Sequence, residues 1–262
     1  MSDPGSYTDI RFDVADGIAT ITIDRPERGN KFRPETAREL ADALRRVRDD
    51  ADLRVGILTG TGEKFFCIGG EHDPVTAFDP GAAMPIVDVY ELLDVVPKPI
   101  IAAVNGFAVG GGNVLHVMCD LSIAAEHAVF RQVGPLVGSF DAGYGTWYLE
   151  DVVGRKRAKE LWYLNRKYTA DQALAMGLVN EVVPAARLME RAREVAGELM
   201  GRGAGALAAL KAAFSARHTG VAGQARLAHD QLLTHYLRSE EAEELGEAFA
   251  ARRRADPTRF YR

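Results

Sequence analysis

Short apolar segments alternate with amphipathic segments along the first part of the chain, and this alternation restricts the fold more than any other feature. Residues 17–26, GIATITIDRP, carry β-branched side chains on both alternating faces and end at a proline, which is typical of a strand. Residues 33–50 place apolar side chains on one helical face, with Pro34 near the start. Residues 54–60, RVGILTG, form a second apolar run that stops at a glycine. The pattern predicts an α/β core.

The alternation continues and then gives way to helices. We expect further strands at 98–106, 121–126, 128–130 and 178–184, a buried helix at 111–120, and helices at 156–164, 169–177 and from about 185 onward. Thr169 and Gln172 have the spacing of a capping box, and Gly177 is a suitable stop. We therefore predict an α/β core over residues 1–184 and a helical C-terminal region over residues 185–262.

Composition and charge exclude several classes of protein. The 262 residues are 47% apolar, which is enough for a sizeable core, and the net charge of −5 comes from interspersed charges without a basic stripe. We expect no nucleic-acid partner, and we expect the basic end, RRRADPTRFYR, to be a solvated helix end or a subunit contact. Two cysteines cannot form a disulfide framework and fit a reducing compartment. With no export signal visible, we expect a cytoplasmic protein.

One uncharged stretch has about the length of a membrane-spanning helix. Residues 100–118 contain no Asp, Glu, Lys or Arg. They do contain Asn105, Asn113, His116 and four glycines, so a buried strand, a tight turn and a buried helix explain them better. We expect no membrane association.

Two glycine-rich turns follow apolar runs, FFCIGGEHD at 65–73 and FAVGGGNVL at 107–115. Each alone is ordinary turn chemistry. Together they would supply two backbone N–H donors to one oxygen, as an enolate or oxyanion of a thioester requires. The spacing matches neither a dinucleotide fingerprint nor a phosphate loop. His72 has no second ligand at metal spacing and Cys67 has no histidine partner, so we expect no metal site and a small buried cysteine.

A third stretch, RQVGPLVGSFDAGYG at 131–145, holds Ser139 and Asp141 with no evident general base beside them. Taken alone, the two residues are equally a capping pair in a turn. A buried Asp held by a hydroxyl would instead serve as an acid if burial raises its pKa. The sequence of this stretch leaves both interpretations open.

In their order and spacing, FCIGGEHD, IAAVNGFAVGGGNVLHVMCDLSIAAEHAVF and GPLVGSFDAGYGTWYLEDVVGRKRAKELWYL resemble the crotonase (enoyl-CoA hydratase/isomerase) superfamily. The resemblance runs from about Tyr7 to the C-terminus. It implies a spiral of ββα turns, a CoA thioester substrate, and homotrimers commonly paired into homohexamers. It also implies an oxyanion hole formed by the N–H groups of Gly70 and Gly111.

The resemblance also bears on the reaction. Hydratases of this superfamily use two glutamates, and the matching positions here are Val114 and Gly134, which cannot transfer a proton. GSFDAGYG is similar to the signature of the 1,4-dihydroxy-2-naphthoyl-CoA synthases of menaquinone biosynthesis and to the ketocyclohexanecarboxyl-CoA hydrolases. The similarity implies that Asp141 is the acid/base carboxylate, Ser139 its hydrogen-bonding neighbour, and Tyr236 a C-terminal tyrosine that reaches the pocket.

The same similarity implies ligands for small groups and for CoA. In synthases with glycine at the Gly134 position, a bound bicarbonate replaces the missing carboxylate, and its ligands match Gln132 and Trp162 here, although a Trp on an apolar helix face is usually core. RPERGNKFRPET resembles the CoA-adenine loop, which implies nucleotide contacts for Arg28, Lys31 and Lys64. Two positions depart from the synthases. Glu71 replaces Asp after the paired glycines, and the loop that follows offers Phe78 in place of tyrosine.

We therefore expect a cytoplasmic lyase that acts through a thioester enolate and makes or breaks a ring C–C bond, like a naphthoate synthase. The alternatives are a ring-opening β-keto acyl-CoA hydrolase, an atypical enoyl-CoA hydratase or isomerase, and a non-catalytic acyl-CoA-binding or RNA-associated homologue. Loss of turnover with retained binding in Asp141→Asn would separate the enzymes from the last class.

Overall fold

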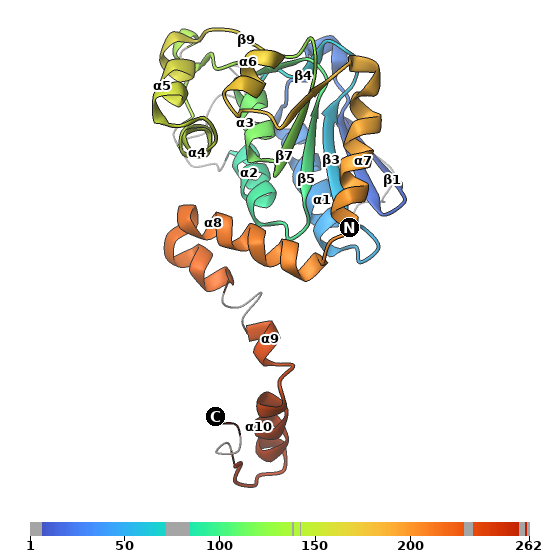
Figure 1. Cartoon of the computed structure of the whole chain (residues 1–262), viewed down its shortest axis with the longest axis vertical. Coiled ribbons are helices and arrows are strands. Elements are labelled where there is room, and N and C mark those ends of the chain that lie inside the picture. The colour runs from blue at the N-terminus through green and yellow to red at the C-terminus, as the bar shows by residue number, and fades with distance from the viewer. Residues whose placement is uncertain are drawn as a thin grey trace. The chain divides into compact units, whose positions relative to one another are not determined.

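A computed structural model describes residues 7–71, 84–137, 139–141, 143–227, 233–256 and 260 (Figure 1). The chain forms two compact units, Met1–Ala208 and Ala209–Arg262. The functional division expected at residue 184 stays a prediction. The first unit also contains the helix that follows this boundary, α7 (Leu188–Met200).

The larger sheet of the first unit has six strands in the order β1-β2-β3-β5-β7-β10. Their bounds are Ile10–Ala15, Ile18–Ile23, Val55–Gly60, Ile100–Val104, Leu121–Ala125 and Glu181–Val183. β1 and β2 pair antiparallel, and all other pairs are parallel. The hairpin turns at Asp16 and Gly17, both with positive φ (52° and 76°), because the type I′ turn that matches strand twist needs this geometry.

The smaller sheet has the order β4-β6-β8-β9, with bounds Phe65–Cys67, Phe107–Val109, Val129–Arg131 and Tyr168–Thr169. The first three strands are parallel, and β9 pairs antiparallel with β8. β3 and β4 are consecutive in the chain, as are β5 and β6, and then β7 and β8. In each of these pairs, the first strand belongs to the larger sheet and the second to the smaller sheet. This is the spiral of ββα turns that the sequence predicts.

Helices cover both faces of the larger sheet. α1 (Pro34–Asp49), α2 (Pro85–Val95) and α3 (Gly111–Met118) share one core with alternate strand residues, and α7 packs on β3, β5 and β7 from the other side (Figure 1). Ile57 and Ile101 belong to the α7 side, and Leu58 and Ala102 to the other side. Because β3 and β5 are buried on both faces, they read as continuous apolar runs.

The remaining helices of the first unit are α4 (Leu149–Val153), α5 (Arg155–Leu164) and α6 (Ala170–Ala175). The capping box predicted for α6 is confirmed, since Thr169 N–H donates to Gln172 Oε1 at 2.9 Å and Gln172 N–H donates to Thr169 Oγ1 at 3.3 Å. The predicted stop is confirmed too, with Gly177 at φ 78° and Leu178 N–H donating to Ala173 O at 2.8 Å.

Residues 100–118 contain the expected buried strand, β5, and buried helix, α3, and a short strand that was not predicted, β6, precedes the glycine turn between them. Within the described ranges, no helix combines the length and the apolarity that crossing a membrane requires. α8 (Ala204–Leu227) begins in the first unit, and α9 (Thr234–Tyr236) and α10 (Glu240–Ala250) belong to the second. A non-helical residue, Gly220 at φ 54°, interrupts α8.

Candidate active site

The two glycine turns lie side by side at the end of β4 and the start of α3. A Cβ atom placed on Gly69, whose φ is +92°, would lie 3.3 Å from the backbone N of Gly111. In the described part of the chain, no acceptor binds the N–H of Gly70 or of Gly111. The structure therefore brings together the two donors that the sequence predicts from separate turns, and it leaves both free to bind one oxygen.

The ring of Phe32 explains why neither position tolerates a side chain. A Cβ on Gly70 would lie 3.0 Å from Phe32 Cε2, and a Cβ on Gly111 would lie 2.7 Å from Phe32 Cζ. The backbone of Phe32 also holds the first turn, because its N–H donates to Gly69 O at 3.0 Å and its carbonyl accepts from Glu71 N–H at 2.9 Å. Phe32 is thus a common support for both turns.

α3 begins directly against β4. A Cβ on Gly112 would lie 1.9 Å from the carbonyl oxygen of Cys67, so only glycine allows this contact. The first turn of α3 presents its N–H groups and the positive end of its dipole at Gly111, which favours negative charge there. Val114, where the hydratases have a glutamate, is 1% exposed in the apolar core. Cys67 is fully buried as expected, and burial raises the pKa of its thiol to about 12.

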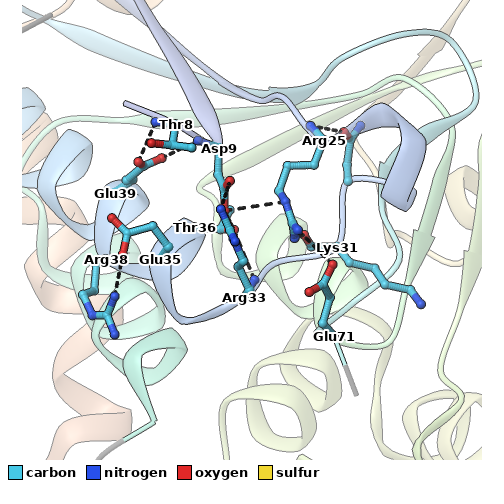
Figure 2. A network of polar contacts seen from close by, with 11 residues as sticks. Thr8, Asp9, Arg25, Lys31, Arg33, Glu35, Thr36, Arg38, Glu39 and Glu71 are labelled. Carbon is cyan, nitrogen blue, oxygen red and sulfur yellow. Dashed lines mark hydrogen bonds and ion pairs between the residues drawn. The ribbon is translucent and has the colours of Figure 1, made fainter. Parts of the chain in front are cut away.

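A buried arginine fixes Glu71, the residue that follows Gly70. Arg25 Nη2 pairs with Glu71 at 2.9 Å, and Arg25 Nη1 donates to Lys31 O at 2.6 Å (Figure 2). The Arg25 side chain is only 10% exposed, so its position is well defined. Glu71, at the position where the synthases have Asp, thereby ties the Gly69–Gly70 turn to the loop before α1.

The same arginine belongs to a wider network around Asp9 (Figure 2). Asp9 pairs with Arg25 at 3.5 Å and with Arg33 at 2.7 Å, and it also accepts from the hydroxyl of Thr36. Burial alone would raise the pKa of Asp9, but the hydrogen bonds from Arg33 and Thr36 and the charge of Arg25 lower it overall. Asp9 therefore stays ionised and holds Arg25 at Nε, while Glu71 pairs with Nη2 of the same guanidinium group (Figure 2).

Asp141 is held by the turn that follows it. Gly145 N–H donates to Asp141 Oδ1 at 2.8 Å, and the indole N–H of Trp162 donates to Gly145 O at 2.7 Å. Burial raises the pKa of the Asp141 carboxyl, and the hydrogen bond from Gly145 opposes part of this shift. Ser139 is exposed, and its backbone N–H donates to Gly134 O at 2.8 Å. The hydrogen-bonding neighbour of Asp141 is thus Gly145, whereas the resemblance implies Ser139.

Two tyrosines, Tyr90 and Tyr144, lie within electrostatic reach of this carboxylate, and a third, Tyr148, stacks on Tyr144. Tyr90 on α2 is 3% exposed, and its hydroxyl oxygen lies 3.3 Å from a Cβ placed on Gly111. Its ring lies 5.6 Å from the ring of Tyr144, which stacks on Tyr148 at 5.8 Å. Burial and the charge of Asp141 raise the pKa of Tyr90. The apolar segment around Tyr90 carries no signal of a site in the sequence, because its partners come from distant segments.

The groups expected to hold a bicarbonate differ in how well they fit an anion. Gln132 is 1% exposed, and among the described residues neither end of its amide has a hydrogen-bond partner, so it suits a small polar ligand. The Trp162 N–H already donates to Gly145. A Cβ on Gly134 would lie 2.6 Å from the carbonyl oxygen of Ser139, so backbone fills this direction. As arranged here, only Gln132 offers hydrogen bonds to an anion.

The remaining predicted residues lie in several places. Arg28 and Lys31 flank Gly29, whose carbonyl accepts from Ile68 N–H at 3.2 Å, so their loop packs against the chain just before Gly69. Lys64 precedes β4, with its ammonium 5.2 Å from the ring centroid of Phe65. Tyr236 is 39% exposed on α9 in the second unit, and its role stays a prediction. His72 and Phe78 fall outside the described residues.

Comparison with known proteins agrees with this arrangement. Residues 13–258 match the family model described as enoyl-CoA hydratase/isomerase. The chain belongs to this family. An enoyl-CoA hydratase from Bacillus anthracis is 30% identical with a TM-score of 0.75, and an enoyl-CoA hydratase subunit from Geobacillus kaustophilus is 28% identical with a TM-score of 0.77. Each alignment covers 95% of this chain and 98% of the other. DspI of Pseudomonas aeruginosa is 26% identical with a TM-score of 0.78, over 90% of this chain and 98% of DspI.

Family membership and the site describe the same kind of protein. The chain is a crotonase-fold, acyl-CoA-processing enzyme of the hydratase/isomerase family. Its paired glycines are in contact, and a carboxyl group of raised pKa lies beside the tyrosine that faces Gly111. Apolar or glycine residues stand at the two positions of the hydratase glutamates.

Proposed function

We propose that the enzyme acts on an acyl-CoA through a thioester enolate and makes or breaks a ring C–C bond, with naphthoate-synthase-like ring closure as the first candidate. The observation that carries the proposal is that Tyr90, whose hydroxyl faces Gly111, also feels the charge of Asp141, in a site that has Val114 and Gly134 at the glutamate positions. Two-glutamate hydration requires titratable groups that these positions lack.

The paired N–H groups would bind the thioester oxygen. Removal of a proton from the carbon beside the thioester moves negative charge onto this oxygen, so donors that are already in place lower the barrier. The start of α3 adds its dipole at Gly111. Because Phe32 and the Arg25–Glu71 ion pair hold both turns, little reorganisation would be needed as the charge develops.

Asp141 would handle the proton at the other reacting centre. In ring closure, the enolate carbon forms a bond to a ketone or carboxyl carbon of the same acyl group as the C=O π bond breaks, and the oxygen of that group takes a proton. Where the acceptor is a carboxyl carbon, one of its oxygens then leaves as water. A carboxyl group whose pKa is raised by burial holds a proton closer to neutral pH than an exposed one does. Gly145 fixes one oxygen of this carboxyl group at 2.8 Å.

A bicarbonate ion in this site remains a proposal that depends on Gln132 alone. Its buried amide offers a donor and an acceptor that have no partner in the part of the chain that the structure describes. The Trp162 N–H and the space beside Gly134 are already engaged within the chain.

Ring opening of a β-keto acyl-CoA is the second candidate. It runs the same type of C–C chemistry in reverse, with water attacking the ring ketone and the thioester enolate leaving. The absence of tyrosine from the sequence 71–87, where the synthases carry a lid hydroxyl, favours this candidate.

Product analysis by mass spectrometry separates these reactions. Purified enzyme is incubated with o-succinylbenzoyl-CoA, 2-oxocyclohexanecarboxyl-CoA or crotonyl-CoA, each with and without bicarbonate. Loss of water from the first substrate supports the synthase. Gain of water by the second, with the first unchanged, identifies a ring-opening hydrolase. Turnover of crotonyl-CoA alone contradicts the proposal and assigns a hydratase that works without the two glutamates.

A further inference from the structure

Tyr90 places a hydroxyl group beside the oxyanion glycine without using it in the fold. Its oxygen lies 3.3 Å from a Cβ placed on Gly111, and its side chain is 3% exposed. Among the described residues, this hydroxyl has no hydrogen-bond partner. A buried tyrosine normally pairs its O–H, so an unpaired one that faces a binding site indicates a ligand.

The ring of Tyr90 is fixed while its hydroxyl stays free. Tyr90 belongs to the buried face of α2, which packs against α3, and its ring contacts the ring of Tyr144 with centroids 5.6 Å apart. Tyr144 follows Asp141 by three residues, and the charge of Asp141 acts on the Tyr90 phenol. The Tyr90 hydroxyl therefore faces Gly111 and also lies within electrostatic reach of the Asp141 carboxyl group.

The chemistry of the hydroxyl specifies what it binds. Burial and the nearby Asp141 carboxylate raise the pKa of Tyr90 well above its ordinary value, so the phenol keeps its proton and acts as a donor. The thioester oxygen already has two donors, the N–H groups of Gly70 and Gly111. The Tyr90 hydroxyl, as a third donor, therefore needs a different acceptor. That acceptor is an oxygen on the β-carbon, the carbon next to the enolate carbon in the acyl group.

We propose that Tyr90 is a specificity-determining residue whose hydroxyl donates a hydrogen bond to an oxygen on the β-carbon of the acyl group, so that the site selects 3-oxoacyl or 3-hydroxyacyl thioesters of CoA. The proposal rests on the proposed enolate chemistry of an acyl-CoA. It names the class of thioester that the Tyr90 hydroxyl would recognise, because the product of ring closure and the substrate of ring opening both carry an oxygen on the β-carbon, whereas o-succinylbenzoyl-CoA itself has none there.

The test compares two four-carbon thioesters that differ at the β-carbon, acetoacetyl-CoA and butyryl-CoA, by titration calorimetry on the full-length protein. Wild type is expected to bind acetoacetyl-CoA more tightly. Tyr90→Phe is expected to weaken acetoacetyl-CoA about tenfold, the size of one hydrogen bond, and to leave butyryl-CoA unchanged. Tyr168→Phe is the matched control, since Tyr168 is also buried but donates to Glu160 at 3.1 Å outside the site.

Thermal unfolding separates this role from a structural one. Tyr90→Phe loses no hydrogen bond of the fold and is expected to keep the wild-type Tm, whereas Tyr168→Phe is expected to lower it. Equal weakening of both thioesters by Tyr90→Phe, or no weakening of either, overturns the role of Tyr90. A wild type with no preference for acetoacetyl-CoA overturns that role alone. A wild type that binds neither thioester overturns the proposed function as well.

Discussion

Asp141 and Gly145 lie so close together that a side chain on Gly145 would collide with the Asp141 side chain. Gly145 N–H donates to Asp141 Oδ1 at 2.8 Å, and a Cβ on Gly145 would lie 2.8 Å from Asp141 Cγ. The carbonyl of the same glycine accepts from Trp162 at 2.7 Å. Trp162 on α5 therefore fixes the Asp141 carboxyl through one residue of backbone, which is a role that its position on an apolar helix face does not reveal.

Asp141→Asn should separate catalysis from binding. The amide oxygen still accepts from Gly145, so the turn is retained, but the side chain cannot transfer a proton. We expect kcat to fall by about 10²–10⁴-fold, with little change in affinity for a CoA thioester. Steady-state kinetics and calorimetry on the same preparation measure both. Asp13→Asn, at an exposed strand position, is the matched control. Undiminished kcat in Asp141→Asn would remove Asp141 from the mechanism.

The raised pKa of Asp141 also has a consequence for stability against pH. The folded chain retains this proton to a higher pH than the unfolded chain, whose carboxyl group titrates near 3.8. The stabilisation is therefore complete below that value and is lost as pH rises through the folded-state pKa. Asp141→Asn has no titrating carboxyl group and so does not lose stability in this way. The free energy of unfolding of the variant relative to wild type should therefore increase as the pH rises from 3.8 through the folded-state pKa of Asp141. Urea denaturation of both proteins at several pH values measures the difference, and a constant difference would contradict the shift.

Gly111→Ala should damage both the fold and the site. The new methyl group would lie 2.7 Å from the Phe32 ring and 3.3 Å from the Tyr90 hydroxyl, so the ring must move. We expect a loss of about 1–3 kcal/mol in the free energy of unfolding together with a loss of activity. Gly197→Ala, on α7 with no atom within 4 Å of its Cβ, should instead stabilise the protein by about 0.5–1 kcal/mol.

A second substitution shows whether Phe32 is the cause. Gly111→Ala combined with Phe32→Leu removes the ring atoms that the methyl group meets, so part of the lost stability should return. Denaturation of the single and double variants forms a mutant cycle. Strictly additive losses would mean that the contact with Phe32 does not explain the requirement for glycine.

The elements with strong local patterns were predictable from the sequence, and their through-space partners were not. The helix at Pro34–Asp49, the strand at Val55–Gly60 and the capping box at Thr169 rest on periodicity or on neighbours in the chain. β1 and β4 were not assigned, although Asp16-Gly17 is a hairpin signal that a search for turn dipeptides would have found.

In the site, the glycine pairs were predictable because glycine itself marks a close backbone approach. Tyr90 and Arg25 were not assigned a place beside them, because an aromatic residue in an apolar helix and an arginine in a loop are both common. Tyr90 is distinguished by its proximity to Gly111, which lies 21 residues further along the chain. Arg25 is distinguished by its ion pair with Glu71, which lies 46 residues further along. Only the fold brings these residues together.

Glu71→Gln tests the connection between Arg25 and the oxyanion turn. The variant keeps the side-chain size but loses the ion pair at 2.9 Å with an arginine that is only 10% exposed. We expect kcat/KM to fall by up to about tenfold, because a small displacement of the Gly70 N–H weakens its bond to the developing charge. Glu35→Gln breaks an exposed pair with Arg38 at 2.6 Å and should leave kcat/KM unchanged. Equal effects of the two changes would argue against a specific link to the turn.

Gln132→Met tests whether a small anion occupies the site. The buried amide has no partner at either end within the described ranges, so replacing it with an apolar side chain of similar size should leave the free energy of unfolding unchanged or raise it by about 1 kcal/mol. Bicarbonate that binds this amide in the folded state should raise the Tm of wild type but not of the variant. Chloride at the same ionic strength is the control. An equal rise in Tm for both proteins would show that bicarbonate acts elsewhere, and the amide of Gln132 would then have to meet the acyl group or water.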